Sequence, residues 1–124
     1  MVGGGQGAFI GQWHRAAIRL DDQAELVAGN FSRDFENTLI TGRELGLGES
    51  RIYRDYMETA EEEFGRENGI EFVVIVTPNN THHPMARAFL EKGVHVVCDK
   101  PLTLTLAEAE DLESLARKKG LLFG

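Results

Sequence analysis

Asp99, Lys100 and Pro101 form the group of residues with the clearest capacity for chemistry. They follow residues 94–98, Val-His-Val-Val-Cys, an apolar run that predicts a buried strand. A lysine at the mouth of such a strand can be desolvated, which favours its neutral amine. Lys100 could then act as a general acid or base, or polarise a hydroxyl or carbonyl group. A plain exposed ion pair between Lys100 and Asp99 is equally compatible with the spacing.

A second polar group follows the apolar run 72–76, and its members are Thr77, Pro78, Asn79 and His82. The run has no polar alternation, so we expect a strand buried on both faces, as in a parallel sheet. Pro78 stiffens the loop. Asn79 and His82 can hydrogen-bond a ribose or a ring amide. The alternative is that Asn79 or Thr81 merely caps the next helix.

The other histidines and the single cysteine do not add a metal site or a nucleophile. His82 and His83 are adjacent, and neither His14 nor His95 completes a ligand spacing with them. We therefore expect no metal, and we interpret His83 as structural or solvated. Cys98 closes an apolar strand, which is typical of a small core residue rather than a nucleophile.

The first eleven residues contain five glycines and lead into helix-like sequence. The spacing Gly3-x-Gly5-x-x-Ala8 satisfies the dinucleotide-binding pattern, with alanine in the third place, where helix and strand pack closely. Gly5, Gly7 and Gly11 offer other registers. The amides around residues 8–10, at the expected start of the helix, would bind a pyrophosphate. The residues expected to contact the cofactor here are Gly3, Gly5, Gly7, Ala8, Phe9 and Ile10. The same pattern suits a methyltransferase that binds S-adenosylmethionine, and a glycine-rich start can also be a flexible tail.

The choice between NAD and NADP depends on the end of the second expected strand, residues 24–29. An acidic residue there would hold the ribose hydroxyls and favour NAD, but none closes this strand. Ser32 and Arg33 can instead receive a 2′-phosphate, because arginine pairs well with phosphate. Asp34 lies close enough to oppose that role, and an ordinary polar loop is the alternative. The residues admit NAD or NADP, with a lean to NADP.

These polar groups need a scaffold, and the apolar periodicity supplies one. It predicts helices over residues 8–20, 34–45, 55–67, 84–92 and 105–119, and strands over residues 24–29, 51–53, 72–76, 94–98 and 121–123. Asp55 caps the third helix, and Thr105 with Glu108 forms a capping box. The alternation predicts an α/β fold, a doubly wound parallel sheet of Rossmann type. Since every polar group follows a strand's carboxyl end, we expect a single site.

Length and charge exclude several classes of protein. One hundred and twenty-four residues make one domain, and 20 acidic against 13 basic residues give a net charge of −7. That charge argues against nucleic acid or an anionic membrane as partner. No apolar run could span a bilayer or serve as a signal peptide. One cysteine fits a reducing compartment, so we expect a cytoplasmic protein.

In this order, the motifs resemble those of the Gfo/Idh/MocA family of oxidoreductases, which includes glucose–fructose oxidoreductase and inositol dehydrogenases. The matching segments are residues 2–11 with His14, residues 76–79 with His82, and residues 97–102. The last is similar to the family's Glu-Lys-Pro motif, with Asp99 in place of glutamate. The combination is specific and covers nearly the whole chain.

The resemblance implies a Rossmann domain over residues 1–124 that binds NAD or NADP. It implies hydride transfer between nicotinamide and a hydroxyl-bearing carbon of a sugar or polyol. Lys100 would contact the nicotinamide ribose and the substrate and assist proton transfer, with Asp99 orienting it. The resemblance places Thr77, Asn79 and His82 around the nicotinamide ribose, and Pro78 and Pro101 complete the cofactor-binding set.

The chain departs from the family pattern at both ends. Family members carry a second α/β domain that binds substrate, forms the homo-oligomer and supplies a catalytic histidine. Only Met1 and Val2 precede the glycine turn, where the family has a full first strand. We therefore expect a fragment, truncated at both ends, that binds NAD(P) without turnover by itself. A non-catalytic dinucleotide-binding module is the alternative, and residues 99–101 disfavour a methyltransferase.

Overall fold

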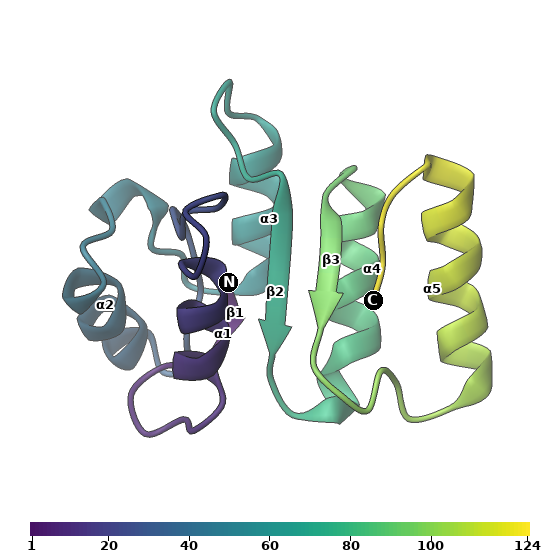
Figure 1. The fold of residues 1–124 in the computed structure, drawn as a ribbon, viewed down its shortest axis with the longest axis horizontal. Coiled ribbons are helices and arrows are strands. Elements are labelled where there is room, and N and C mark those ends of the chain that lie inside the picture. The colour runs from purple at the N-terminus through teal and green to yellow at the C-terminus, as the bar shows by residue number, and fades with distance from the viewer. The chain divides into compact units, whose positions relative to one another are not determined.

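The computed structural model describes residues 1–124 and contains three strands and five α-helices, drawn in Figure 1. In chain order these elements are β1 (Val2–Gly3), α1 (Gly11–Ile18), α2 (Phe35–Glu44), α3 (Tyr56–Phe64), β2 (Phe72–Val76), α4 (His82–Glu91), β3 (His95–Cys98) and α5 (Leu106–Lys119). Two short 3₁₀ helices are η1 (Glu49–Arg51) and η2 (Asn79–Thr81). No helix is both long and apolar enough to cross a membrane. The chain forms two units, Met1–Thr59 and Ala60–Gly124, which are described in turn.

Single parallel bridges join the extended segments of the first unit. Val2 of β1 is bridged to Asn30, and Gly29 is bridged to Ile52. The Tyr53 amide donates to the Gly29 carbonyl at 3.0 Å. Three segments distant in the sequence thus run in parallel, with few ladder hydrogen bonds to hold them together.

Side-chain caps fix the starts of two helices. The Asp34 carboxylate accepts from the Glu36 amide at 3.1 Å and caps α2. Asp55 accepts from the Glu58 amide at 2.9 Å, and the Glu58 carboxylate accepts from the Arg54 amide at 2.6 Å. Both caps satisfy first-turn amides that have no partner inside a helix. The expected cap at Asp55 is confirmed, and Asp34 is a cap that was not predicted from the sequence.

A parallel pair of strands and two helices form the second unit. Val73 lies opposite Val96, and Ile75 lies opposite Cys98. Helix α4 packs against both strands and against α5, as Figure 1 shows. The most deeply buried apolar residues of this unit are Val73, Ile75, Phe89, Leu90, Val96 and Leu112. The strand predicted over residues 72–76 is confirmed, because a continuous apolar run needs cover on both faces.

Asp111 on α5 links that helix to α4. Its carboxylate accepts from Arg87 Nη1 at 2.7 Å and lies 2.8 Å from His83 Nε2. The Arg87 hydrogen bond is the largest cause of a lowered pKa at Asp111, followed by the hydrogen bond from His83. The interpretation of His83 as a structural residue is confirmed. The capping box of Thr105 and Glu108 is also confirmed at the start of α5.

Three expectations for the first unit are wrong. The strand expected over residues 51–53 is reduced to one bridge at Ile52, because Arg51 ends the 3₁₀ helix η1. Helix α1 begins at Gly11 and not at Ala8, because the Ala8 amide donates to the Gly5 carbonyl at 3.0 Å and closes a turn there. The strand expected over residues 24–29 is also absent, and only Gly29 is bridged. Residues 24–28 have strand-like composition, yet no neighbouring segment forms a bridge with them.

The second unit also departs from the predicted boundaries. Helix α3 ends at Phe64 rather than near Glu67. Helix α4 begins at His82, two residues earlier than predicted, since proline is tolerated in a helix's first turn. Strand β3 is not buried on both faces, because Val97 is 43% exposed. The expected last strand is reduced to one bridge between Phe123 and Val96.

Candidate functional site

The glycine turn, residues 3–11, packs so closely that two positions have no room for a side chain. A Cβ on Gly5 would lie 2.4 Å from Asn37 Oδ1 and 2.9 Å from the Phe31 carbonyl oxygen. A Cβ on Gly11 would lie 2.5 Å from the Gly4 Cα. Glycine is therefore required at both positions. The register with Ala8 in the third place is wrong, since Ala8 is exposed, and the alternative that includes Gly11 fits, because Gly11 makes the close contact.

Side chains of α2 hold the turn, and some of its amides have no partner. The Gln6 amide donates to Asn37 Oδ1 at 3.0 Å and to Thr41 Oγ1 at 3.1 Å. The Ala8 amide is used within the turn. The amides of Phe9 and Ile10 donate no hydrogen bond within the protein. They lie just before α1, where backbone N–H groups bind phosphate well.

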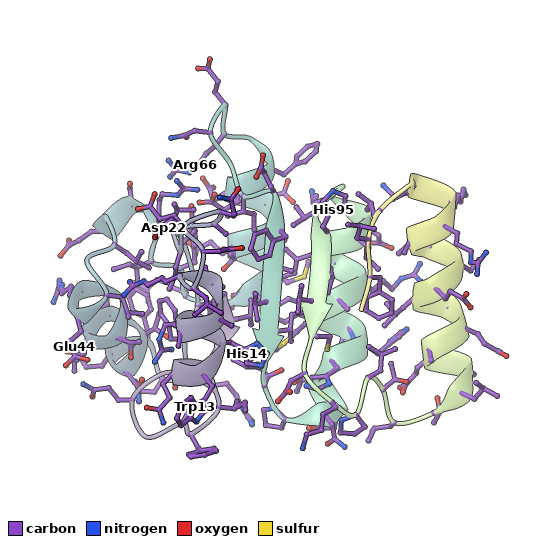
Figure 2. The ribbon with its side chains drawn as sticks, in the orientation of Figure 1. Trp13, His14, Asp22, Glu44, Arg66 and His95 are labelled. Atoms are coloured by element: carbon purple, nitrogen blue, oxygen red, sulfur yellow. The ribbon has the colours of Figure 1, made fainter.

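A pocket of about 390 Å³ opens beside the turn. Its lining includes Gln6, Phe9, Arg15 and Glu44. Arg15 Nη1 donates to the Gly4 carbonyl at 2.8 Å, and burial, with the nearby charge of Arg19, lowers the pKa of Arg15. Figure 2 shows Trp13 on α1, on the side of the glycine turn. Free amides, an open pocket and a bare backbone fit a phosphate-bearing ligand.

Ser32 and Arg33 lie at the end of the second extended segment, in the same unit as the glycine turn. The Ser32 hydroxyl accepts from the Asp34 amide at 3.1 Å and still has a proton to donate. Arg33 is exposed and makes no ion pair. The Asp34 carboxylate, which the sequence suggested would oppose phosphate, is engaged as the cap of α2.

In the second unit, the His82 ring joins the two motifs that the sequence singled out. His82 Nε2 lies 2.8 Å from the Thr77 carbonyl oxygen, and Nδ1 lies 2.9 Å from the Pro101 carbonyl oxygen. The ring is 1% exposed. Both polar atoms of His82 therefore face protein carbonyls, so the ring has no free polar atom for a cofactor. Its geometry fits a residue that positions the loop beside Lys100.

Asn79 is the member of this group that is free to bind a ligand. It is exposed, and its carboxamide makes no hydrogen bond within the protein. Helix α4 has no side-chain cap at Thr81, whose hydroxyl contacts the Pro78 carbonyl oxygen at 2.6 Å and Thr77 Oγ1 at 2.8 Å. The alternative that Asn79 or Thr81 caps the next helix is therefore wrong.

Lys100 is exposed, so this chain does not provide the desolvation expected around its amine. The Asp99 amide donates to the Ile75 carbonyl at 2.9 Å and extends the pairing of β2 and β3 to the residue before Lys100. The Lys100–Pro101 peptide bond is cis. Burial, with a smaller effect of Asp99, raises the pKa of the Cys98 thiol to about 12. A thiol of that pKa is a poor nucleophile, which supports a structural role for Cys98.

Two residues near the glycine turn were not found from the sequence. The buried Asn30 side chain donates through Nδ2 to the carbonyl oxygens of Ser32, Tyr53 and Arg54, at 3.1, 3.2 and 2.9 Å. The guanidinium carbon of Arg54 lies 4.2 Å from the centre of the Phe35 ring. An asparagine closing an apolar segment was a usable signal for Asn30. Arg54 had none. No group of His, Cys, Asp or Glu side chains is placed to hold a metal ion.

The parallel strands, the bare glycine turn and its free amides define a dinucleotide-binding protein of Rossmann type. Comparison with known proteins agrees, because residues 1–124 match the model of the Gfo/Idh/MocA family, "Oxidoreductase family, NAD-binding Rossmann fold". The chain belongs to this family and constitutes its NAD-binding Rossmann domain.

Similar proteins are oxidoreductases about three times as long. The uncharacterized oxidoreductase YfiI of Bacillus subtilis is 44% identical over 100% of the chain and 32% of its own length. The scyllo-inositol 2-dehydrogenase (NADP(+)) IolW of the same species is 39% identical over 49% of the chain and 17% of its own length. A solved inositol dehydrogenase homolog from Azotobacter vinelandii, complexed with NADH and myo-inositol, is 45% identical with a TM-score of 0.96. The alignment covers 98% of this chain and 32% of that one.

Proposed function

We propose that this chain is the cofactor-binding part of an NAD(P)-dependent oxidoreductase that acts on a hydroxyl group of a sugar or polyol. The observation that carries the proposal is the His82 bridge. One buried ring contacts both the Thr77-Pro78-Asn79 loop and the Lys100-Pro101 segment. Myo-inositol in the complex of the similar Azotobacter protein supports a cyclic polyol as substrate class.

Each part of the site has a distinct role in this proposal. The amides of Phe9 and Ile10 bind the pyrophosphate, and the bare backbone of the turn lets it approach. Asn79 hydrogen-bonds the ribose at the nicotinamide end. The bound nicotinamide supplies hydride chemistry.

Lys100 acts on the substrate hydroxyl. Its amine takes the hydroxyl proton when the alcohol is oxidised, and its ammonium returns that proton in the reverse direction. His82 contributes without touching substrate, because it fixes the Pro101 carbonyl next to Lys100. The exposure of Lys100 fits a side chain that meets substrate outside this domain.

We further propose that the whole protein has a second domain, which binds substrate and forms a homo-oligomer, and that it works in the cytoplasm. The support for the second domain is length, since the chain spans about a third of YfiI. The single cysteine supports a reducing compartment, and the family resemblance supports the homo-oligomer. The family resemblance places a catalytic histidine in that domain. That domain would then cover the exposed Lys100 side chain.

Titration of the chain with NADH and NADPH, followed by nicotinamide fluorescence, tests the proposal directly. Binding of at least one nucleotide is expected, and S-adenosylmethionine should not bind. If the folded chain binds neither nicotinamide nucleotide, the proposal is wrong. In the full-length protein, Lys100→Ala should change nucleotide affinity little and abolish hydride transfer.

Substitution of His82 tests whether its ring positions the loop at the nicotinamide end. His82→Phe keeps a ring of similar size and removes both ring-nitrogen contacts to carbonyl oxygens, so it should weaken NADH binding more than ADP-ribose binding. The reason is that His82 positions only the nicotinamide-end loop. Equal weakening of both ligands would contradict this role, and His83→Phe serves as the control on the same helix.

A further inference from the structure

Arg15 on α1 is a half-buried arginine whose guanidinium forms no ion pair with a carboxylate. Other arginines of the chain do pair with carboxylates at 2.7 Å, namely Arg43, Arg87 and Arg117. Burial is the largest cause of the lowered pKa of Arg15, and no acidic group raises that pKa. Moving a charged group out of water without a counter-charge costs free energy, so this position needs an explanation.

The Arg15 side chain reaches back over the first turn of its own helix. Side chains of an α-helix tilt toward its N-terminus, so residue 15 lies over Gly11, four positions earlier. A Cβ on Gly11 would lie 2.9 Å from Arg15 Nη1 and 2.8 Å from the Gly4 carbonyl oxygen. Because Gly11 has no side chain, the guanidinium can approach that oxygen, and Nη1 donates to it at 2.8 Å.

The peptide bond between Gly4 and Gly5 is held from two sides. Its carbonyl oxygen accepts from Arg15, and its N–H group donates to the Phe31 carbonyl oxygen at 2.9 Å. No backbone amide donates to the Gly4 carbonyl, so Arg15 is its donor within the protein. Gly4 has a φ of +78°, and glycine changes its backbone angles more easily than other residues. Two hydrogen bonds from different segments therefore fix a peptide that would otherwise reorient readily.

This peptide determines how the chain enters the turn that follows. The Gly5 carbonyl accepts from the Ala8 amide at 3.0 Å, and the amides of Phe9 and Ile10 come next in the chain. A rotation of the peptide before Gly5 would change the direction in which those two amides point. A site made of main-chain N–H groups binds more tightly when their direction is fixed before the ligand arrives.

We propose that Arg15 is a positioning residue for dinucleotide binding, because it fixes the Gly4–Gly5 peptide ahead of the free amides of the turn. The proposal rests on the proposed function, since it needs a bound dinucleotide. Arg15 acts through the main chain and not by contact with the ligand. Its loss should therefore weaken every ligand that carries the pyrophosphate, whereas loss of the His82 ring should affect the nicotinamide end.

Titration of variants with NADH and with ADP-ribose is the first test. Arg15→Met keeps a long side chain and removes the donor, so it should weaken both ligands equally, roughly tenfold each. Arg15→Lys, which retains a donor on a long side chain, should bring both affinities to within about threefold of wild type. Arg19→Met on the same helix is the matched control and should change neither affinity, because the exposed Arg19 side chain makes no hydrogen bond.

Amide hydrogen exchange separates positioning from direct contact with the ligand. In the ligand-free wild-type chain, the Gly5 amide should exchange at least about tenfold more slowly than that of an unstructured glycine, and Arg15→Met should remove most of this protection. An unprotected Gly5 amide in the wild type overturns the proposal, whether or not the variant folds. Unchanged protection in a variant that binds NADH weakly also overturns it, because Arg15 would then contact the ligand itself.

The remaining outcomes separate this proposal from the proposed function. If the folded Arg15→Met variant binds NADH within about twofold of wild type, or if Arg15→Lys binds no better than Arg15→Met, the positioning role is wrong and dinucleotide binding stands. If the folded wild-type chain binds neither NADH nor NADPH, the proposed function is wrong, and the positioning role is wrong with it. Arg15→Gln, which has a shorter side chain, replaces Arg15→Met if that variant does not fold.

Discussion

The two units of the chain hold their backbones in different ways. In the first, Met1–Thr59, single bridges join the extended segments, and side-chain amides and hydroxyls hydrogen-bond the main chain of the loops. In the second, Ala60–Gly124, a strand pair is covered by α4, and α4 packs on α5. Polar side chains fix the loops of the first unit around a small apolar core that includes Val2, Phe31 and Ile52, whereas the second unit depends mainly on the apolar packing of its strands and helices.

This difference follows the tasks that we propose for the two regions. A turn that binds phosphate needs free amides and a backbone without side chains, so it cannot be covered by apolar packing. A strand pair that presents Lys100 needs a stiff base, which buried side chains supply. Substitutions can test separately the buried apolar packing and the side-chain hydrogen bonds.

The largest expected effect is on the reactivity of Cys98. Its pKa of about 12 leaves very little thiolate near pH 8, so alkylation by iodoacetamide should be roughly a thousandfold slower than for a free thiol. Measuring the rate in the native chain and again in denaturing urea gives the comparison within one protein. A native alkylation rate within about tenfold of the unfolded rate would show that burial does not suppress the reactivity of the Cys98 thiol.

Removing apolar contacts should cost most in the second unit. Phe89→Ala on α4 should lower the free energy of unfolding by about 3–5 kcal/mol, because Phe89 is 0% exposed. Urea unfolding followed by circular dichroism measures this. Phe64→Ala is the matched control: Phe64 is 62% exposed, and its truncation should cost less than about 1 kcal/mol. Similar losses in both variants would contradict the packing described for α4.

In the first unit, one polar side chain should matter nearly as much. Asn30→Ala leaves three buried or half-buried carbonyl oxygens without their donor and should cost about 2–3 kcal/mol. Asn80→Ala, at an exposed asparagine, should cost less than about 0.5 kcal/mol. The same unfolding experiment distinguishes them. A loss below about 1 kcal/mol for Asn30→Ala would mean that the bridges alone hold the unit.

The smallest effect belongs to the exposed ion pair between α4 and α5. Asp111→Asn should cost no more than about 0.5 kcal/mol near pH 7, because Asp111 is 42% exposed and solvent screens the pair. The native pKa of Asp111 is lowered, so its contribution is complete above the unfolded pKa and is lost as pH falls through the native pKa. Wild-type and variant stabilities should therefore converge in acid. Glu110→Gln, at an exposed glutamate, should show no such convergence.

The sequence predicted those strands and helix caps that depend on residues only a few positions apart. The run Phe72–Val76 and the caps at Asp55 and Thr105 each carry their information within a few residues. The start of α1 was wrong by three residues because the Ala8 amide bonds to Gly5 instead of entering the helix.

For the site, residue types predicted which motifs matter but not how they contact one another. The role of His82 depends on the Pro101 carbonyl, nineteen residues away, which no local pattern encodes. Arg54 acquires its position from Phe35 and Asn30, both distant in the sequence. Pairings of this kind are set by the folded chain, so composition and periodicity do not predict them.

The Asn30 side chain donates only to main-chain carbonyl oxygens, so the side chains of the residues that it holds can change during evolution. The side chains at Ser32 and Arg54 contribute nothing to those hydrogen bonds. They can therefore be exchanged while the backbone that presents them stays in place. Two side chains at the end of the second extended segment are thus free to vary, and a lineage could exchange them without rebuilding the backbone that carries them.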